Sequence, residues 1–199
     1  MPPLVLSPIL ETLNQWDMAI FYLINQGTRN RLFDVAMPFV TDIDNWRIPL
    51  AVVWIGLILF GGKKGRLVAV LMVVCLALSD QLSSSILKPY FARTRPCKIL
   101  ENVHLLVNCS NAFSFPSSHA TNIFAQAALF SYFYRKLTIP VLVFAVLIGY
   151  SRVYVGVHFP FDALFGAVVG IACTVVILVG KTIVTEAFHR IRLRNSKIA

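Results

Sequence analysis

Charged residues are scarce in this sequence, and acidic residues are the scarcer kind. Only 14% of the 199 residues are charged, against about 25% in an ordinary soluble domain. Asp and Glu together number 9, half the 18 Lys and Arg. The sequence also has no internal repeat, no low-complexity segment and no pattern typical of a nucleotide-binding βαβ unit. These absences argue against a soluble catalytic domain and a disordered tail, and the length suits one domain.

Long uncharged apolar runs take the place of those charges. Hydrophobic residues make up 57% of the chain, and the mean hydropathy is +0.73. The runs lack the period-2 alternation of strands. Five stretches approach the roughly 17–20 helical residues that cross a bilayer core, namely residues 48–62, 67–87, 113–134, 137–151 and 163–180. The sequence therefore predicts an all-α fold, a polytopic membrane helix bundle with five spans.

Residues 1–46 are more polar than these runs. They contain two apolar patches, Met18–Ile24 and Leu32–Val40, among several charged residues. We expect amphipathic helices at the outer membrane interface, part of which could supply a sixth, irregular span. The start of the chain has neither a basic segment nor a clear cleavage site, so we expect no removable signal peptide.

Basic residues gather on one side of the predicted membrane. The Gly61–Arg66 turn, the Tyr134–Lys136 turn and the C-terminal region hold ten Lys and Arg against Glu186 alone. The rest of the chain has eight basic and eight acidic residues, so the whole net charge of +9 lies on that side. The positive-inside rule makes this side cytoplasmic, and nucleic acid is not needed to explain the charge. We expect a bundle over residues 47–187 in the cell (inner) membrane and a basic cytoplasmic tail over 188–199.

Two of the four cysteines share one loop. Cys97 and Cys109 follow the second run, on the side opposite the basic turns, and a disulfide between them would close a 13-residue segment. A zinc site has less support, because His104 is the only other soft ligand nearby. Cys75 and Cys173 fall inside predicted spans, where small buried side chains are expected.

Three polar clusters also lie on the side opposite the basic turns. They are Lys88 to Pro96 with Arg95, then Pro116-Ser117-Ser118-His119, then Ser151-Arg152 with His158 and Asp162. Each cluster has a simple structural explanation. Lys and Arg at a helix end reach toward lipid headgroups, Pro-Ser-Ser segments cap helices, and His and Asp four residues apart can pair on one helix face. Connectivity nevertheless brings all three clusters to one membrane face, where they can converge within one bundle.

Together these side chains suit a phosphate. Arg95 and Arg152 can each bind phosphate oxygens through two N–H groups, and Lys88 adds a point charge. Ser117 and Ser118 open a predicted helix, where free backbone N–H groups and the helix dipole favour an anion. We therefore predict that Lys88, Arg95, Ser117, Ser118 and Arg152 bind the substrate.

Three further residues can supply nucleophilic and proton-transfer chemistry. Asp162 can accept the Nδ1 proton of His158, which leaves Nε2 free to attack phosphorus in line. His119 can then protonate the leaving oxygen. The predicted catalytic residues are therefore His158, His119 and Asp162.

In order, the clusters read K-x6-R-P, P-S-x-H and S-R-x5-H-x3-D. They resemble the signature of the type 2 phosphatidic acid phosphatase superfamily, which includes the vanadium haloperoxidases. The resemblance covers residues 60–180 and implies a phosphohistidine on His158, with Asp162 orienting that ring and His119 as general acid. It also implies that the Lys and the two Arg bind phosphate and that no metal or other cofactor is required.

A few polar residues stand apart from this pattern. The family often has Gly where this chain has Ser118, whose backbone N–H can still bind phosphate. Asp80 lies inside a predicted span, and we expect it to form hydrogen bonds with Gln81 and with the serines that follow. His104 and His189 are expected to face solvent or lipid headgroups.

The predicted activity is removal of phosphate from a lipid phosphate or pyrophosphate at the outer leaflet. The resemblance favours undecaprenyl pyrophosphate, with phosphatidylglycerophosphate and lipid A phosphatases as runners-up. A non-catalytic lipid carrier or scaffold is a further alternative, and a vanadium haloperoxidase would share the anion site but is expected to be soluble. The expected partners are the lipid substrate and membrane lipids, without nucleic acid and without an obligate protein partner.

Overall fold

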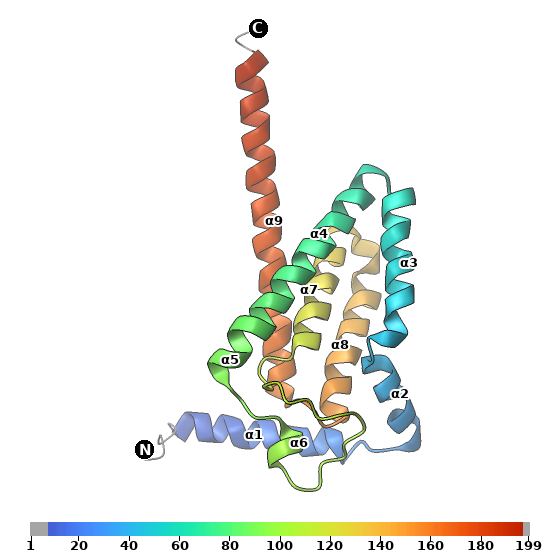
Figure 1. Ribbon diagram of the computed structural model, residues 1–199, viewed down its shortest axis with the longest axis vertical. Coiled ribbons are helices and arrows are strands. Elements are labelled where there is room, and N and C mark those ends of the chain that lie inside the picture. The colour runs from blue at the N-terminus through green and yellow to red at the C-terminus, as the bar shows by residue number, and fades with distance from the viewer. Residues whose placement is uncertain (1–7, 197–199) are drawn as a thin grey trace.

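Figure 1 shows a helical bundle crossed at one end by an additional helix. The computed structural model describes residues 8–196, and helices are the only regular elements in that range. The bundle comprises α3 (Asp44–Phe60), α4 (Gly62–Asp80), α7 (Ser118–Phe133), α8 (Thr138–Tyr154) and α9 (Pro160–Ser196). α9 is the longest and extends well beyond the others at the end where the chain finishes. Predictions that concern residues 1–7, including the absence of a signal peptide, lie outside the described residues, as does Lys197 of the tail.

Three helical segments are long and apolar enough to cross a membrane. They are Gly62–Ile99, Arg135–Tyr154 and Pro160–Ile191, and a bent pair of helices, Arg31–Thr41 with Asp44–Phe60, would make a fourth. The two helices of the pair meet at 52°. The count of five spans is therefore not confirmed. The difference comes from α7, which has 16 residues, and from α3, which has 17 and qualifies only together with α2 (Arg31–Thr41).

The short α7 lies at the centre of the bundle, packed against α4, α8 and α9. Its seam with α9 is lined by Gly166 and Gly170, four residues apart, and then by Thr174. A Cβ atom at Gly166 would lie 2.7 Å from the Ser117 carbonyl oxygen, and one at Gly170 would overlap the Thr121 carbonyl oxygen. Small residues at this spacing let two membrane helices approach closely. The seam therefore holds the start of α7 against the start of α9.

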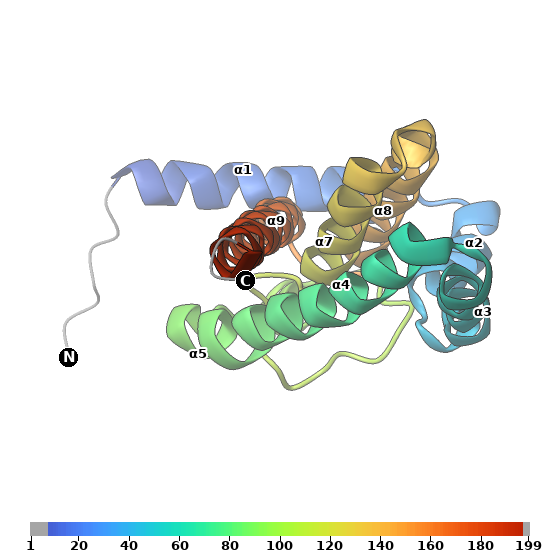
Figure 2. The same ribbon diagram turned by 90° about the horizontal axis from the view of Figure 1, so that it is seen from above.

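The N-terminal helix α1 (Pro8–Asn25) lies across the end of the bundle rather than along it. Seen from above, α9 lies between α1 and the α4–α5 segment (Figure 2). The outward face of α1 carries exposed apolar side chains, among them Ile9, Trp16 and Leu23. Its inward face buries Asp17, Phe21 and Asn25 at a four-residue spacing. Helix α1 thus has an exposed apolar face and a buried face on which two of the three residues are polar.

A long connection at the same end of the bundle joins α4 to α7. After α4 the chain passes through a π-helical segment η1 (Gln81–Leu87), α5 (Lys88–Phe91) and α6 (Pro96–Ile99). A disulfide joins Cys97 to Cys109, as the sequence predicts, with 6.3 Å between the Cα atoms. Cys75 and Cys173 are buried free thiols. The disulfide therefore closes the loop that returns the chain to α7.

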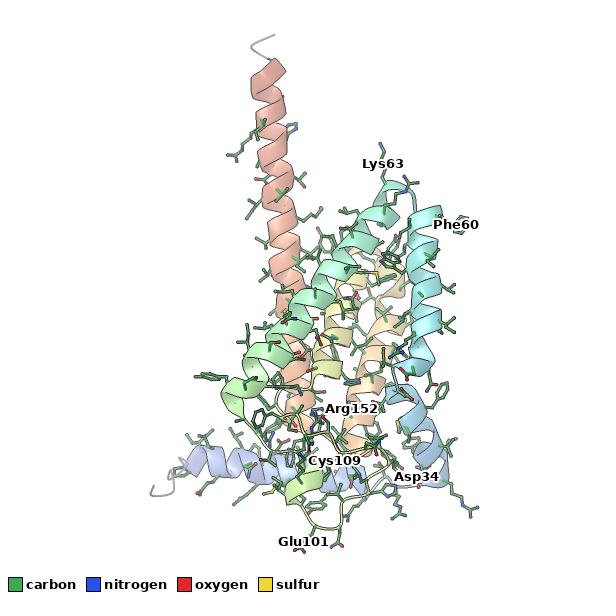
Figure 3. The ribbon with its side chains drawn as sticks, in the orientation of Figure 1. Asp34, Phe60, Lys63, Glu101, Cys109 and Arg152 are labelled. Atoms are coloured by element: carbon green, nitrogen blue, oxygen red, sulfur yellow. A yellow bond between two sulfur atoms is a disulfide. The ribbon has the colours of Figure 1, made fainter. Side chains whose placement is uncertain are left out.

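The two ends of the bundle differ in their charged residues. Figure 3 shows Lys63 at one end, and Glu101, Cys109 and Arg152 toward the other. The second basic turn, η2 (Arg135–Leu137), precedes α8 and belongs with the Lys63 end, because Lys64 lies over the ring of Tyr134 at 4.5 Å. Through residue 196 the predicted tail continues α9 as helix. The arrangement thus keeps the basic turns away from the three polar clusters.

Candidate active site

The imidazole of His158 lies in the short segment between α8 and α9 and is 1% exposed. Its Nε2 atom lies 3.2 Å from Nη1 of Arg95, and its Nδ1 atom lies 3.4 Å from Oδ2 of Asp162. A guanidinium group can only donate, so the Nε2 lone pair faces Arg95 and the ring proton is on Nδ1. This is the tautomer in which Nε2 can act as a nucleophile.

Asp162, in the first turn of α9, is fully buried and has a donor on each carboxylate oxygen. Oδ2 accepts from the backbone N–H of Phe159 at 2.9 Å and from the hydroxyl of Ser114. Oδ1 accepts from Nη1 of Arg93 at 2.8 Å. The carboxylate is therefore fixed in orientation, with Oδ2 turned toward the ring of His158.

The segment that follows Cys109 holds two of the predicted phosphate-binding cations. Nζ of Lys88 donates to the carbonyl oxygen of Phe113 at 2.8 Å, and Nε of Arg95 donates to that of Ala112 at 2.8 Å. Both side chains are buried, with 7% and 5% exposed. An ammonium group has three N–H donors, so Lys88 keeps donors for a phosphate. The loop carbonyl oxygens thus orient these two cations.

Arg152 reaches the site from α8. Its Nη1 atom donates to the Thr41 hydroxyl at 2.8 Å, while its buried Nε has no partner among the described residues. Lys88, Arg95 and Arg152 all lie within Coulombic range of His119. An unpaired buried donor is unfavourable by about 1–3 kcal/mol. A cation cluster that contains one is suited to bind an anion.

The two predicted serines have different surroundings. Ser117 is the N-cap of α7: its Oγ accepts from the N–H of Ala120 at 3.4 Å, and its own N–H donates to the Asp162 carbonyl oxygen at 3.0 Å. The simple capping explanation therefore applies to Ser117. The hydroxyl of Ser118 pairs with that of Ser84 in the π-helical segment at 3.0 Å. Ser118 thus lies with the next residue, His119, on the wall of the cavity described below.

His119 lines a cavity of about 940 Å³ inside the bundle, a volume within the usual range of ligand pockets. Most of the wall is apolar, with Leu50 from α3, Leu76 from α4 and Phe144 from α8. Ser118 and Asp80 also line it. The predicted general acid therefore faces a space lined mainly by hydrocarbon side chains.

Three residues near His158 carry contacts that were not assigned from the sequence. Ser114 and Arg93 both bind Asp162, and Arg93 also forms an ion pair with Asp17 at 2.7 Å. The only signal for Arg93 was its place inside the first cluster. Ser114 and Asp17 had no signal, because Ser114 lies 48 residues from Asp162 and Asp17 lies 144 residues from Phe161 along the chain.

The structure extends one expectation about other polar residues and corrects another. Asp80 accepts from Ser84 at 3.4 Å, as expected, but its shorter bond, 3.0 Å, comes from Asn122 on α7. His104 is not a headgroup residue: its Nε2 lies 2.8 Å from Asp34, and the ring meets Tyr154 edge to face. The loop folds back over α2 and α8, which gives the imidazole a carboxylate partner. His189 is exposed on α9.

The side chains gathered at this site are suited to bind an anion rather than a metal ion. Within residues 8–196, no three His, Cys, Asp or Glu side chains gather in a way that could hold a metal ion. Instead, two histidines share the site with the three cations Lys88, Arg95 and Arg152.

The chain is similar to proteins of known families. The family model described as the PAP2 superfamily matches residues 67–184. The chain is 29% identical over 171 residues to the lipid A 4'-phosphatase of Bacteroides thetaiotaomicron, with 81% of this chain and 75% of that protein covered. It is 30% identical over 144 residues to undecaprenyl-diphosphatase BcrC of Bacillus subtilis, with 71% and 72% covered. The crystal structure of Aquifex aeolicus LpxE matches it with a TM-score of 0.68 and 30% identity, covering 81% of this chain and 93% of that one.

Proposed function

This chain belongs to the PAP2 superfamily of membrane lipid phosphatases, and from that premise we propose that it hydrolyses a lipid pyrophosphate, undecaprenyl pyrophosphate, through a phosphohistidine. The observation that carries the proposal is the position of His119 on a large, mainly apolar cavity. A general acid must lie beside the leaving oxygen. The leaving group then lies where hydrocarbon side chains line the wall, which suits a lipid.

In the proposed first step, Nε2 of His158 attacks phosphorus while Arg95, Arg152 and Lys88 bind the phosphate oxygens. The bond from phosphorus to the leaving oxygen breaks, and His119 gives that oxygen its proton. The leaving group is then undecaprenyl monophosphate. The Nδ1 proton stays on the ring, where Asp162 stabilises the positive charge that develops on the imidazole.

In the second step, water hydrolyses the phosphohistidine. His119, now neutral, takes a proton from the water as its oxygen bonds to phosphorus and the P–N bond breaks. Inorganic phosphate leaves, and His158 and His119 return to their starting states. Every proton is moved by a side chain of this site, so the scheme requires no metal.

The membrane arrangement is part of the same proposal. We place the Lys63 end in the cytoplasm and the site at the extracytoplasmic side of the cell (inner) membrane, because the basic turns gather at that end. Residues 1–46 then lie at the outer interface, and residues 47–187 form the membrane bundle. The 16-residue α7 is counted with the spans, because it runs inside the bundle beside α8 and α9.

The test is phosphate release from undecaprenyl pyrophosphate by the purified protein in detergent, with EDTA present. Wild type should release phosphate, and His158→Ala should not. Release that persists in the variant would contradict the proposed nucleophile. If wild type acts only on phosphatidylglycerophosphate or on lipid A, the substrate assignment is wrong while the reaction stands. No release from any of the three would favour a non-catalytic carrier.

A further inference from the structure

An ion-pair chain outside the proposed reaction connects the N-terminal helix to Asp162. Oδ2 of Asp17, on α1, lies 2.7 Å from Nη2 of Arg93, and Nη1 of Arg93 lies 2.8 Å from Oδ1 of Asp162. One guanidinium thus joins two carboxylates, which are 1% and 0% exposed. A buried carboxylate without a partner is strongly unfavourable. Arg93 is the cation available to both.

Further contacts fix Asp17 and Arg93, two members of this series of ion pairs. Oδ1 of Asp17 accepts from the N–H of Phe161 at 2.8 Å, so α1 is attached to the first turn of α9. The guanidinium of Arg93 also packs over the ring of Phe159, with 4.1 Å from Cζ to the ring centroid. Phe159 directly follows His158, and Phe161 directly precedes Asp162. The ion pairs therefore contact the backbone just after His158, through Asp17, and the carboxylate partner of His158, through Arg93.

Arg93 influences Asp162 by a second route. Its carbonyl oxygen accepts from the N–H of Ser114 at 2.7 Å, and the hydroxyl of Ser114 donates to Oδ2 of Asp162. Both carboxylate oxygens of Asp162 are thus bound by groups that residue 93 holds in place. Rotation of this carboxylate away from Nδ1 of His158 would break the bond to Arg93.

We propose that Asp17 and Arg93 are positioning residues, which hold Asp162 in the orientation that keeps Nε2 of His158 directed at phosphorus. The inference rests on the proposed phosphatase function. It assigns α1, a helix across the end of the bundle, a part in catalysis through one buried carboxylate. The alternative is that the ion pairs only attach α1 to the bundle.

The experiment compares Asp17→Asn, Arg93→Ala and wild type on the lipid phosphate that wild type hydrolyses. We expect kcat to fall by roughly 10- to 100-fold in both variants, the range found when hydrogen-bond partners of metal-binding histidines are removed. KM should change little, because Lys88, Arg95 and Arg152 are retained. Added guanidine should restore part of kcat in Arg93→Ala, since the Arg93 side chain is 24% exposed and a small cation can reach its place.

The matched control is Asp34→Asn. Asp34 is also a carboxylate of the N-terminal region with two side-chain partners, but these are His104 and Tyr154, away from Asp162. Its kcat should equal that of wild type. Thermal unfolding in detergent reports whether each variant keeps its fold.

Three outcomes would count against the proposal. Wild-type kcat in a folded Asp17→Asn or Arg93→Ala protein would overturn it. If kcat falls only in variants whose unfolding temperature also falls, and guanidine does not restore it, the ion pairs serve only to attach α1. An inactive wild type on every lipid phosphate would instead refute the proposed function, and this inference with it.

Discussion

At the scale of single residues, the site depends on one imidazole with different partners on its two nitrogen atoms. Burial lowers the pKa of His158 from 6.5 to about 3, with Arg152 and Arg95 acting in the same direction and Asp162 opposing them. The ring is therefore neutral at physiological pH, as a nucleophile must be. Between these two pH values His158 is neutral in the folded protein and protonated in the unfolded chain, and this difference affects stability.

The first prediction concerns the pH dependence of stability. Unfolded His158 takes up a proton near pH 6.5, whereas folded His158 does so near pH 3. Between these values the unfolded chain binds more protons, so the free energy of unfolding falls as the pH drops, by up to about 1.4 kcal/mol per pH unit. Unfolding in detergent should therefore depend on pH more steeply in wild type than in His158→Gln between pH 4 and about 6. Equal slopes would contradict the low pKa.

The second prediction concerns Arg152. Replacing its guanidinium in Arg152→Lys removes the unpaired Nε and the two-point grip on an anion. A charge-assisted hydrogen bond contributes about 1.5–3 kcal/mol, so kcat/KM should fall by roughly 10- to 100-fold. Steady-state kinetics with the lipid substrate measures this. Arg47→Lys is the control, because the Arg47 side chain is 71% exposed and its one ion pair within residues 8–196 is with Asp44. A similar loss there would show a nonspecific effect.

At the scale of elements, two features hold the site together: the close contact of α7 with α9, and the loop closed by the disulfide. The α7–α9 contact sets Ser117 N–H against the Asp162 carbonyl oxygen, and so aligns the second and third polar clusters. The loop supplies the carbonyl oxygens that bind Lys88 and Arg95. The α7–α9 contact includes Asp162, a predicted catalytic residue, and the loop orients two predicted phosphate-binding residues.

The third prediction tests the helix seam. Gly170→Ala places a methyl group against the Thr121 carbonyl oxygen, and the helices must separate or shift. Overpacking of this kind destabilises by about 1–3 kcal/mol. Thermal unfolding in detergent should show it. Gly180→Ala, on the same helix with no atom within 4 Å of the new Cβ, should leave the midpoint unchanged or raise it. Equal midpoints in the two variants would contradict the close approach.

The fourth prediction tests the loop. The Cys97→Ala, Cys109→Ala double variant releases the segment between these residues, and loss of a bridge over a loop of this length costs about 3 kcal/mol. We expect a lower unfolding temperature and a higher KM, because Ala112 and Phe113 follow Cys109 closely and then hold the two cations less firmly. In wild type, Cys97 and Cys109 should resist alkylation until a reductant is added. Rapid labelling without reductant would exclude the disulfide.

At the scale of the whole molecule, the bundle separates its basic turns from its chemistry. Lys63 and Glu101 lie at opposite ends, with the polar clusters at the Glu101 end (Figure 3). The cavity beside His119 reaches from that end into the apolar part of the bundle. His119 therefore lies where the polar end of the bundle meets a space lined mainly by hydrocarbon side chains.

The fifth prediction concerns orientation in the membrane. In intact cells, a membrane-impermeant thiol reagent should label Glu101→Cys but not Lys63→Cys, and both should react after lysis. Both positions are exposed, and the two native free thiols are buried, so background labelling should be low. Labelling of Lys63→Cys alone in intact cells would reverse the proposed topology.

Sequence alone was enough for the helical class, the membrane character and the polar clusters, and it offered Cys97 and Cys109 as a candidate disulfide that the structure contains. Hydropathy runs, charge asymmetry and short motifs are properties of neighbouring residues, so they can be read without coordinates. Tertiary structure decided the contacts that join distant segments. Asp17 meets Phe161 across 144 positions, His104 meets Asp34, and α7 proves too short to count as a span by length alone. Such contacts depend on which faces of the helices pack together, and no local pattern specifies that choice.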